Sequence, residues 1–382
     1  RKLMLVRDRM GIKPLYVTDR YMFASEIKAF AHMGFSPDAR VWANYLAYGR
    51  MDDDHQSTWF KNVRQVAPGT IEVYTKMKGS IARYSETYWT LDPRPKHNPS
   101  MFMDLLTDSV KLRLRSDVPV GITLSDGIDS QAIAALSTGI SETGTYSFNE
   151  SDYAVKGTGV HSIYTPEDFI MDARRMMWHL EGPFGGVSTL AYAKLVSRMS
   201  PKVLLEGQGS DELMGGYAYH GIADNIRRAE NGTEFLYDGC ISERIEGAAN
   251  PPTYPRPFTD DFSNNVYADT FYRKLPRVLR MNDRIAGSVG KEFREPYIDH
   301  RLVEFILSLP PDMRRKKRIL RESMEGLVPE SIRSADKQAI TTPQQEWFRG
   351  PLKEYIVDTI TSSRFRERGL FNSSVVESAF KR

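Results

Sequence analysis

The stretch Val118-Pro-Val-Gly-Ile-Thr-Leu124 runs directly into Ser125-Asp-Gly-Ile-Asp-Ser130, and this junction decides the fold. The first part is short, apolar and partly β-branched, whereas the second is small, hydroxylated and acidic. A helix-forming segment, residues 131–136, follows at once. This order predicts a buried strand, a tight loop and the N-terminus of a helix. Such a turn exposes unpaired backbone N–H groups at the positive end of a helix dipole, which favours phosphate binding.

The side chains of this loop suit a nucleotide phosphate. Ser125 and Ser130 offer hydroxyl donors, and Gly127 allows the backbone to approach a ligand closely. Asp129 is suited to hold Mg²⁺ on the phosphates. A second interpretation stays open at this point, because Ser and Asp are also the usual N-cap residues of an ordinary strand-to-helix turn.

A second segment of the same design lies further along the chain. Residues 202–205 predict a short buried strand, and Glu206-Gly-Gln-Gly-Ser-Asp-Glu212 follows it. Two such strand–loop–helix units fit one crevice at the carboxyl ends of a parallel sheet. Neither loop is a Walker P-loop or a Gly-x-Gly-x-x-Gly dinucleotide fingerprint, so transfer of a γ-phosphoryl group is not the favoured chemistry.

Composition limits the class of protein. The 382 residues exceed a typical single domain, and 41% hydrophobic with 26% charged residues indicates a soluble globular chain with a substantial core. The 52 basic and 49 acidic residues nearly balance, so no nucleic-acid partner is expected, and the basic run at 314–318 is predicted to be a solvated helix start. No apolar run approaches the roughly 20 residues that cross a bilayer, so no membrane partner is expected. Cys240 is the only cysteine, which excludes an intrachain disulfide and favours a reducing, cytoplasmic location.

The chain divides into two regions. Residues 1–90 alternate short apolar segments with turns, and we expect a β-rich α+β region with strands at 2–6, 15–17, 21–23 and 70–74 and helices at 26–32 and 41–48. Residues 91–99 contain three prolines and are predicted to be a linker. From residue 100 to 382, helical patterns such as 101–114 and 187–199 alternate with short apolar strands, which predicts a parallel α/β sheet.

These motifs carry a family resemblance. Ser125–Ser130 resembles the pyrophosphate loop of the ATP-pyrophosphatase superfamily, and its combination with Leu205–Tyr217 is similar to the glutamine-dependent asparagine synthetase family. Further segments match that family in order: Arg7–Tyr16, Phe23–Lys28, Glu292–Phe305, Lys317–Arg321, Leu327–Pro329 and Trp347–Leu352. The resemblance therefore covers essentially the whole chain.

The resemblance implies a two-domain α/β enzyme. It implies an ATP-pyrophosphatase (adenine nucleotide α-hydrolase-like) domain with a parallel sheet at 100–382, preceded at 1–90 by the second half of an α+β N-terminal-nucleophile glutaminase domain. The implied reaction uses ATP and Mg²⁺ to convert a carboxylate, with aspartate as the leading candidate, to an amide. It proceeds through an acyl-adenylate and releases pyrophosphate and AMP. A homodimer is also implied.

The resemblance also assigns roles to individual residues of this sequence. The resemblance places Leu124 and Phe148 beside the adenine and ribose, and backbone at Gly207 against the nucleotide. Asp129 and Asp211, one on each loop, are suitable ligands for one shared Mg²⁺. Gln208 lies where well-studied asparagine synthetases carry Glu, and a neutral amide can bind but cannot act as a base.

Two further residues can be interpreted either as catalytic groups or as ordinary surface charges. Lys317 occupies the family's catalytic lysine position, and its alternative is a solvated member of the basic run. Glu292 matches an acidic residue that faces the acyl acceptor in relatives and positions ammonia or accepts its proton. Its alternative is a helix-surface ion pair with Lys291 or Arg294.

The chain also departs from the family pattern. The family's glutaminase uses an amino-terminal Cys, whereas this sequence begins at Arg1 and has no Cys before Cys240. We therefore expect a fragment whose glutaminase nucleophile is encoded upstream, with ammonia from glutamine supplied elsewhere. Asp126 replaces the first Gly of the pyrophosphate loop, which adds a negative charge near phosphate and removes conformational freedom. Two alternatives to asparagine synthesis stay open: an amidating or lactam-forming ligase acting on another carboxylate, and a degenerate member that binds nucleotide without catalysis.

Overall fold

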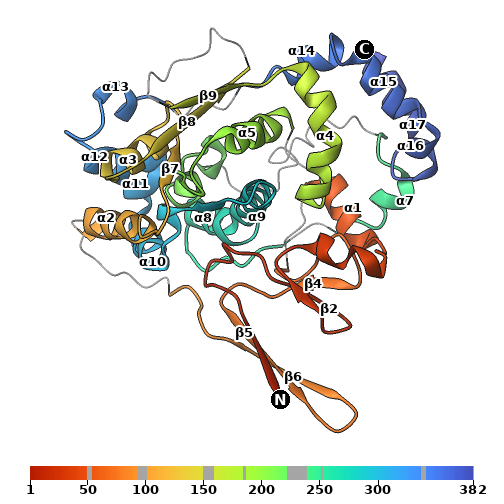
Figure 1. Ribbon diagram of the computed structural model, residues 1–382, viewed down its shortest axis with the longest axis horizontal. Coiled ribbons are helices and arrows are strands. Elements are labelled where there is room, and N and C mark those ends of the chain that lie inside the picture. Colours follow the sequence, from red (N-terminus) through yellow and green to blue (C-terminus); the bar gives the residue numbers. More distant parts are fainter. Residues whose placement is uncertain are drawn as a thin grey trace.

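The computed structural model describes residues 1–49, 54–92, 101–148, 159–183, 186–221, 239–250, 253–336 and 341–381. These residues form a β-rich region at the N-terminus and a larger α/β region (Figure 1). In the described residues, no helix is both long and apolar enough to cross a membrane.

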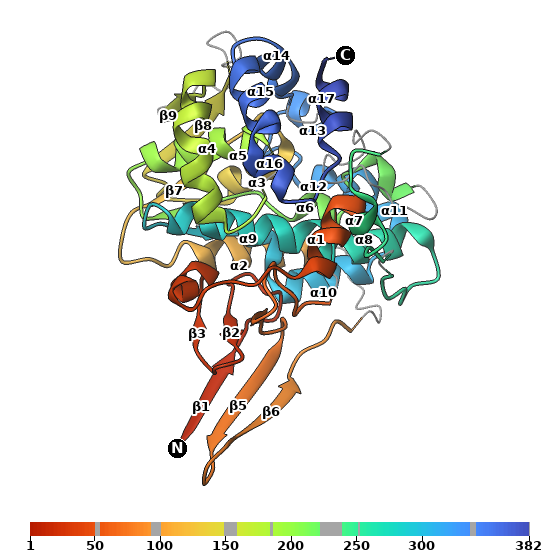
Figure 2. The ribbon, with the colours of Figure 1, turned by 90° about the vertical axis from the view of Figure 1, so that its right-hand side faces the viewer.

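Two antiparallel sheets build the N-terminal region. One has the order β1-β5-β6, and the other has the order β3-β2-β4. Its elements are β1 (Lys2–Val6), β2 (Tyr16–Thr18), β3 (Phe23–Ala24), η1 (Ile27–Met33), α1 (Ala39–Tyr48), β4 (Val63–Gln65), β5 (Thr70–Lys76) and β6 (Ile81–Thr87). Strands β1, β5 and β6 project away from the helical body, with the N-terminus at their far end (Figure 2).

A five-stranded parallel sheet forms the centre of the second region. Its order is β11-β10-β7-β8-β9, with β7 (Val120–Thr123), β8 (Glu142–Ser147), β9 (Val160–Ile163), β10 (Val203–Leu205) and β11 (Glu292–Arg294). Leu205 pairs with Ile122 of β7 and with Arg294 of β11. The loops that follow β7 and β10 therefore leave the sheet at the same edge, as expected for parallel neighbours.

Helices cover the sheet and extend to the C-terminus. They are α2 (Met101–Arg113), α3 (Ile128–Leu136), α4 (Pro166–Leu180), α5 (Val187–Arg198), α6 (Ser210–Leu213), η3 (Ala218–Gly221), α7 (Glu243–Glu246), α8 (Asp261–Phe271), α9 (Lys274–Gly287), η5 (Pro296–Ile298), α10 (His300–Ser308), α11 (Pro311–Arg314), η6 (Arg315–Lys317), α12 (Arg318–Ser323), α13 (Glu330–Arg333), α14 (Gln344–Arg349), α15 (Lys353–Thr361), α16 (Ser363–Glu367) and α17 (Ser373–Lys381).

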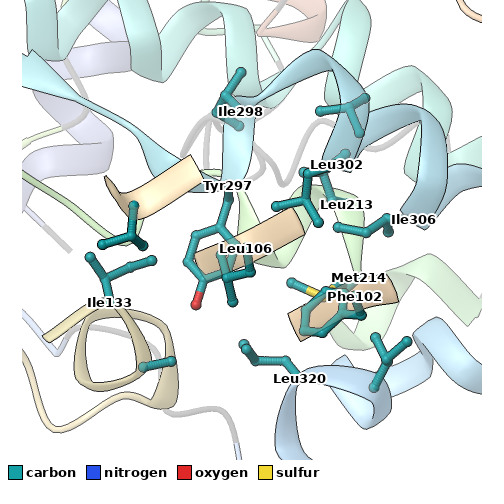
Figure 3. Packing of buried hydrophobic residues seen from close by; sticks show 14 of the residues in the cluster. Phe102, Leu106, Ile133, Leu213, Met214, Tyr297, Ile298, Leu302, Ile306 and Leu320 are labelled. Carbon is teal, nitrogen blue, oxygen red and sulfur yellow. The ribbon is translucent and has the colours of Figure 1, made fainter. Parts of the chain in front are cut away.

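The core follows from the alternation of side chains along the strands. Val203 and Leu205 pack into the cluster under α2, α3, α10 and α12, whereas Leu204 points to the opposite cluster with α4, α5 and the end of α9. Figure 3 shows the first cluster, where Phe102 and Leu106 of α2 lie near Tyr297 and Leu320. Apolar surroundings on both faces explain why the sequence of β10 is a continuous apolar run.

Most of the predicted architecture is confirmed. Antiparallel sheets precede a parallel α/β sheet, and the strands predicted at 2–6, 70–74 and 202–205 are present. The segment predicted as a helix at 26–32 is a 3₁₀ helix, η1. The prediction of a solvated helix start at 314–318 holds in part: Arg315, Lys316 and Arg318 are exposed and α12 begins at Arg318. Tertiary packing buries the other two residues, Arg314 and Lys317. Residues 93–99 of the predicted linker lie outside the described residues.

Candidate active site

A cavity of about 280 Å³ opens at the carboxyl ends of β7 and β10. The two loops identified in the sequence form its wall. Of the predicted residues, seven line the cavity: Leu124, Ser125, Asp129, Ser130, Gly207, Gln208 and Asp211. The structure thus brings together two segments that are about eighty residues apart in sequence.

Hydrogen bonds within the loop after β7 fix its conformation. Ser130 Oγ accepts from the backbone N–H of Ser125 at 2.9 Å and lies 3.0 Å from Ser125 Oγ. Gln131 Nε2 donates to the carbonyl of Ser125 at 2.8 Å. Gly127 is the N-cap of α3 and has no side chain to cap the first turn, so N–H groups at the positive end of α3 are available to an anion.

The substitution in this loop is tolerated by the backbone. Asp126 is exposed, and its φ is not among the positive values of the described residues. Its position therefore does not require glycine's access to the left-handed region. The remaining effect of Asp126 is its negative charge, which solvent screens at this exposed position.

The second loop packs directly on the first. A Cβ on Gly207 would lie 2.7 Å from Ser130 N and 3.0 Å from Asp129 Cβ, so a side chain here would separate the two loops. Gly209 adopts a φ of 97° against Ile298, a conformation that L residues rarely adopt. The glycines of this loop therefore set the distance between Asp129 and Asp211.

Lys317 joins the two loops. Its Nζ lies 2.7 Å from Asp129 Oδ2 and 2.5 Å from Asp211 Oδ1, and the residue is only 2% exposed. Because both carboxylate oxygens lie within 2.7 Å of one nitrogen, they are close enough to share a single cation. The interpretation of Lys317 as a solvated member of the basic run is wrong.

The turn that carries Lys317 is strained and is tied to the second loop. Lys316 and Lys317 have φ values of 51° and 60°, in the left-handed region that is costly for residues other than glycine. The N–H of Lys317 donates to the carbonyl of Met214, and the N–H of Lys316 donates to that of Gly215. Strain of this kind is held by the surrounding structure and is common at functional sites.

Four predicted residues are not part of the cavity lining: Gly127, Phe148, Glu292 and Lys317. Phe148 packs against Trp347 and Tyr146, with ring centroids 5.8 and 6.1 Å away, and it is Tyr146 that lines the cavity. Glu292 is the first residue of β11 and pairs with Val203, at the amino ends of the strands. Its carboxylate accepts from Arg294 Nε at 2.9 Å and is 47% exposed. The ion pair with Arg294 is therefore present, but on a strand and not on a helix.

Several residues of this site were not predicted from the sequence. Tyr192 of α5 and Asn282 of α9 line the cavity, and no motif marks them, because they reach it from helices. Glu206 also lines the cavity, and although it belongs to the second motif, no role was predicted for it. Gly216 packs against the site from behind, since a Cβ there would overlap Asp211 Oδ1 and lie 2.5 Å from Lys317 Cε.

The donor set fits magnesium only together with a phosphate ligand. Among the described residues, no group of three or more His, Cys, Asp or Glu side chains could hold a metal ion. Two carboxylates plus substrate phosphates, however, are a usual coordination for Mg²⁺. Asp129 and Asp211 supply such a pair at one point of the cavity wall.

Comparison with known proteins identifies both regions. Residues 101–382 match the model of the asparagine synthase family, and residues 1–89 match that of the glutamine amidotransferase domain. Asparagine synthetase [glutamine-hydrolyzing] 1 of Bacillus subtilis is 24% identical over 94% of this chain and 68% of its own length. Asparagine synthetase [glutamine-hydrolyzing] 2 of the same organism is 29% identical over 85% of this chain and 52% of its own length. The amidase chyE of Penicillium rubens is 24% identical over 100% of this chain and 73% of its own length. The chain thus spans between about half and about three quarters of these relatives.

Proposed function

Because the chain belongs to the asparagine synthase family, we propose that it catalyses the ATP-dependent amidation of a small carboxylate, with aspartate as the leading candidate. Members of this family generally use ATP. One observation carries the proposal: Asp129 of the first loop and Asp211 of the second both lie within hydrogen-bonding distance of Lys317 Nζ. We also propose that the nitrogen comes from glutamine as ammonia, since residues 1–89 match the amidotransferase domain. A homodimer stays a prediction.

The proposed reaction has two steps. A carboxylate oxygen of the substrate bonds to the α-phosphorus of ATP, and pyrophosphate leaves with the electron pair of the broken P–O bond. Ammonia then bonds to the acyl carbon, AMP leaves with the electrons of the C–O bond, and nitrogen loses a proton. The first step accumulates negative charge on pyrophosphate, so the enzyme must supply donors and cations there.

The residues of the cavity match these demands. The N-terminus of α3 with Ser125 and Ser130 would bind the pyrophosphate oxygens, and the ammonium of Lys317 would offset their charge. Asp129 and Asp211 would hold Mg²⁺, which supplies further neutralisation of the phosphates when bound. Leu124 and Tyr146 supply apolar cavity wall for the nucleoside.

The test is exchange of labelled pyrophosphate into ATP in the presence of single carboxylic acids. We expect exchange that depends on aspartate or on one other acid of a panel, and mass spectrometry of the product with ammonia identifies the amide. Absence of exchange with every acid would contradict the proposal. If restoring the glycine with Asp126→Gly then produces exchange, the loop charge is the cause of inactivity and the chain is a degenerate member.

Lys317 offers a matched pair of variants. Lys317→Gln removes the cation between Asp129 and Asp211 and should reduce exchange on the order of 10²- to 10³-fold, as for loss of one preorganised electrostatic group. Lys316→Gln removes the neighbouring lysine, whose side chain is 86% exposed, and should leave exchange unchanged. Equal activity of the two variants would remove Lys317 from the mechanism.

A further inference from the structure

A pair of buried carboxyl groups lies beside the site. Glu206 follows the last residue of β10, and Glu295 follows the last residue of β11. Each residue is 4% exposed, and because Leu205 pairs with Arg294, the two residues are neighbours where the strands end. Burial and like charge both disfavour ionisation of two neighbouring carboxyl groups at the same time.

The pair separates two cavities. Glu206 lines the 280 Å³ cavity that also contains Asp129, Gln208 and Asp211. Glu295 lines a second cavity of about 650 Å³, between the N-terminal segment around Lys13 and the strand β11. One carboxyl therefore faces the proposed reaction, and its partner faces a different space.

Glu206 is held in a fixed orientation. Tyr192 Oη donates to Glu206 Oε2 at 2.7 Å, and Asn282 Nδ2 donates to both carboxylate oxygens at 2.8 and 3.0 Å. Gly207, the next residue, abuts the backbone of Asp129 and Ser130, so Glu206 is anchored at the pyrophosphate loop. Such positioning is what a general base requires, because proton transfer depends on geometry first.

Charged groups on three surrounding segments act on the pair. The positive charges of Lys13 and Arg113 stabilise the ionised form of Glu295, whereas the negative charge of Asp283 destabilises it. Lys13 also stabilises the ionised form of Glu206. Burial is the largest cause that raises the pKa of Glu206, and burial followed by the charge of Glu206 raises the pKa of Glu295 to about 8. Glu295 therefore keeps its proton at neutral pH, and the raised pKa of Glu206 favours proton uptake by its carboxylate.

We propose that Glu206 accepts the proton that nitrogen loses during amide formation, and that Glu295 is the positioning residue that holds Glu206 and passes the proton to the second cavity. In this step the C–N bond forms, the C–O bond to AMP breaks with its electrons on AMP, and one nitrogen-bound proton moves to Glu206. The inference rests on the proposed function. Gln208 lines the same cavity but is a neutral amide and cannot act as a base, whereas Glu206 can.

The first experiment separates the two half-reactions. Glu206→Gln should keep carboxylate-dependent ATP–pyrophosphate exchange within about threefold of wild type but reduce kcat for amide formation from ammonium about 100-fold or more, the usual effect of losing a general base. Hydroxylamine also loses a nitrogen-bound proton when it forms a hydroxamate, so product formation from hydroxylamine should fall in this variant as well. Glu142→Gln, which removes a carboxylate of the same sheet outside both cavities, is the control and should leave both reactions unchanged.

The second experiment tests Glu295 through a pH profile. Wild-type amide formation should show a titration step near pH 8, and Glu295→Gln should remove this step without changing exchange. Loss of exchange in Glu206→Gln together with amide formation would show a structural role and overturn the inference. Full amide formation from ammonium in Glu206→Gln would overturn it as well. Absence of exchange in the wild type is a different result, because it contradicts the proposed function itself.

Discussion

At the level of single residues, the position of Lys317 depends on Gly216. A methyl group at Gly216 would overlap Asp211 Oδ1 and crowd Lys317 Cε, so both must move. We expect Gly216→Ala to reduce ATP–pyrophosphate exchange about 100-fold, since a shift near 1 Å in a catalytic group has an effect of this size. Gly221→Ala is the matched control, because a methyl group there meets its nearest neighbour, Arg315 Nη1, at 3.6 Å. Equal activity of the two variants would contradict this account.

At the level of elements, the short turn η6 stores strain that one substitution can release. Lys316 has a φ of 51°, which costs an L residue about 1–2 kcal/mol, and its exposed ion pair with Asp336 at 3.8 Å contributes little. Glycine removes this strain but loses about 0.5–1 kcal/mol of backbone entropy on folding. We therefore expect Lys316→Gly to raise the free energy of unfolding by roughly 0.5–1 kcal/mol, measured by urea denaturation. Lys316→Ala removes the same side chain without relieving the strain, and it should give no gain.

The elements also show what the sequence could and could not predict. The strands β7 and β10 were predictable because each apolar run ends abruptly at Gly, Ser and Asp, a purely local signal. Strand β11 was not, because Glu292-Phe-Arg294 contains a single apolar residue. The family resemblance placed Glu292 at the site, and without the strand its position at the amino end of β11 could not be anticipated.

Burial of charged residues was the harder problem. Five consecutive basic residues at 314–318 are typical of a solvated surface, and only tertiary contacts with the second loop bury Lys317. Tyr192 and Asn282 likewise reach the cavity from helices whose sequences show only ordinary helical periodicity. Local patterns thus predicted the loops, whereas the partners that complete the site depend on packing between distant segments.

At the level of the whole molecule, a buried ion pair connects the two regions. Glu181 accepts from the backbone N–H of Lys28 at 2.8 Å and from Arg284 Nε at 2.9 Å, and the guanidinium of Arg284 lies 5.3 Å from the ring centroid of Tyr16. The side chains of Glu181 and Arg284 are 4% and 0% exposed. Removal of the Glu181 charge leaves the buried guanidinium of Arg284 with Asp283, at 3.3 Å, as its remaining ion-pair partner. We expect Glu181→Gln to lower the free energy of unfolding by about 3 kcal/mol in urea denaturation.

The matched control for this ion pair is at the surface. Arg175 pairs with Asp172 at 2.9 Å, and the Arg175 side chain is 58% exposed, so Asp172→Asn should cost less than ~1 kcal/mol. Similar losses for the buried and the surface variant would show that Glu181 does not hold the two regions together.

The stability of the whole molecule should also depend on pH through the carboxyl pair at the junction of the two regions. Burial and the neighbouring carboxyl of Glu206 raise the pKa of Glu295 from 4.5 to about 8, so the folded protein keeps a proton that the unfolded chain releases. The stability associated with this proton is complete below pH 4.5 and is lost as the pH rises through 8, with a slope of up to ~1.4 kcal/mol per pH unit. Urea denaturation of wild type and Glu295→Gln between pH 5 and 8.5 isolates this contribution, because the other titrating groups are common to both proteins. We expect the stability of wild type relative to the variant to fall steadily across this interval, and a constant difference would contradict the retained proton.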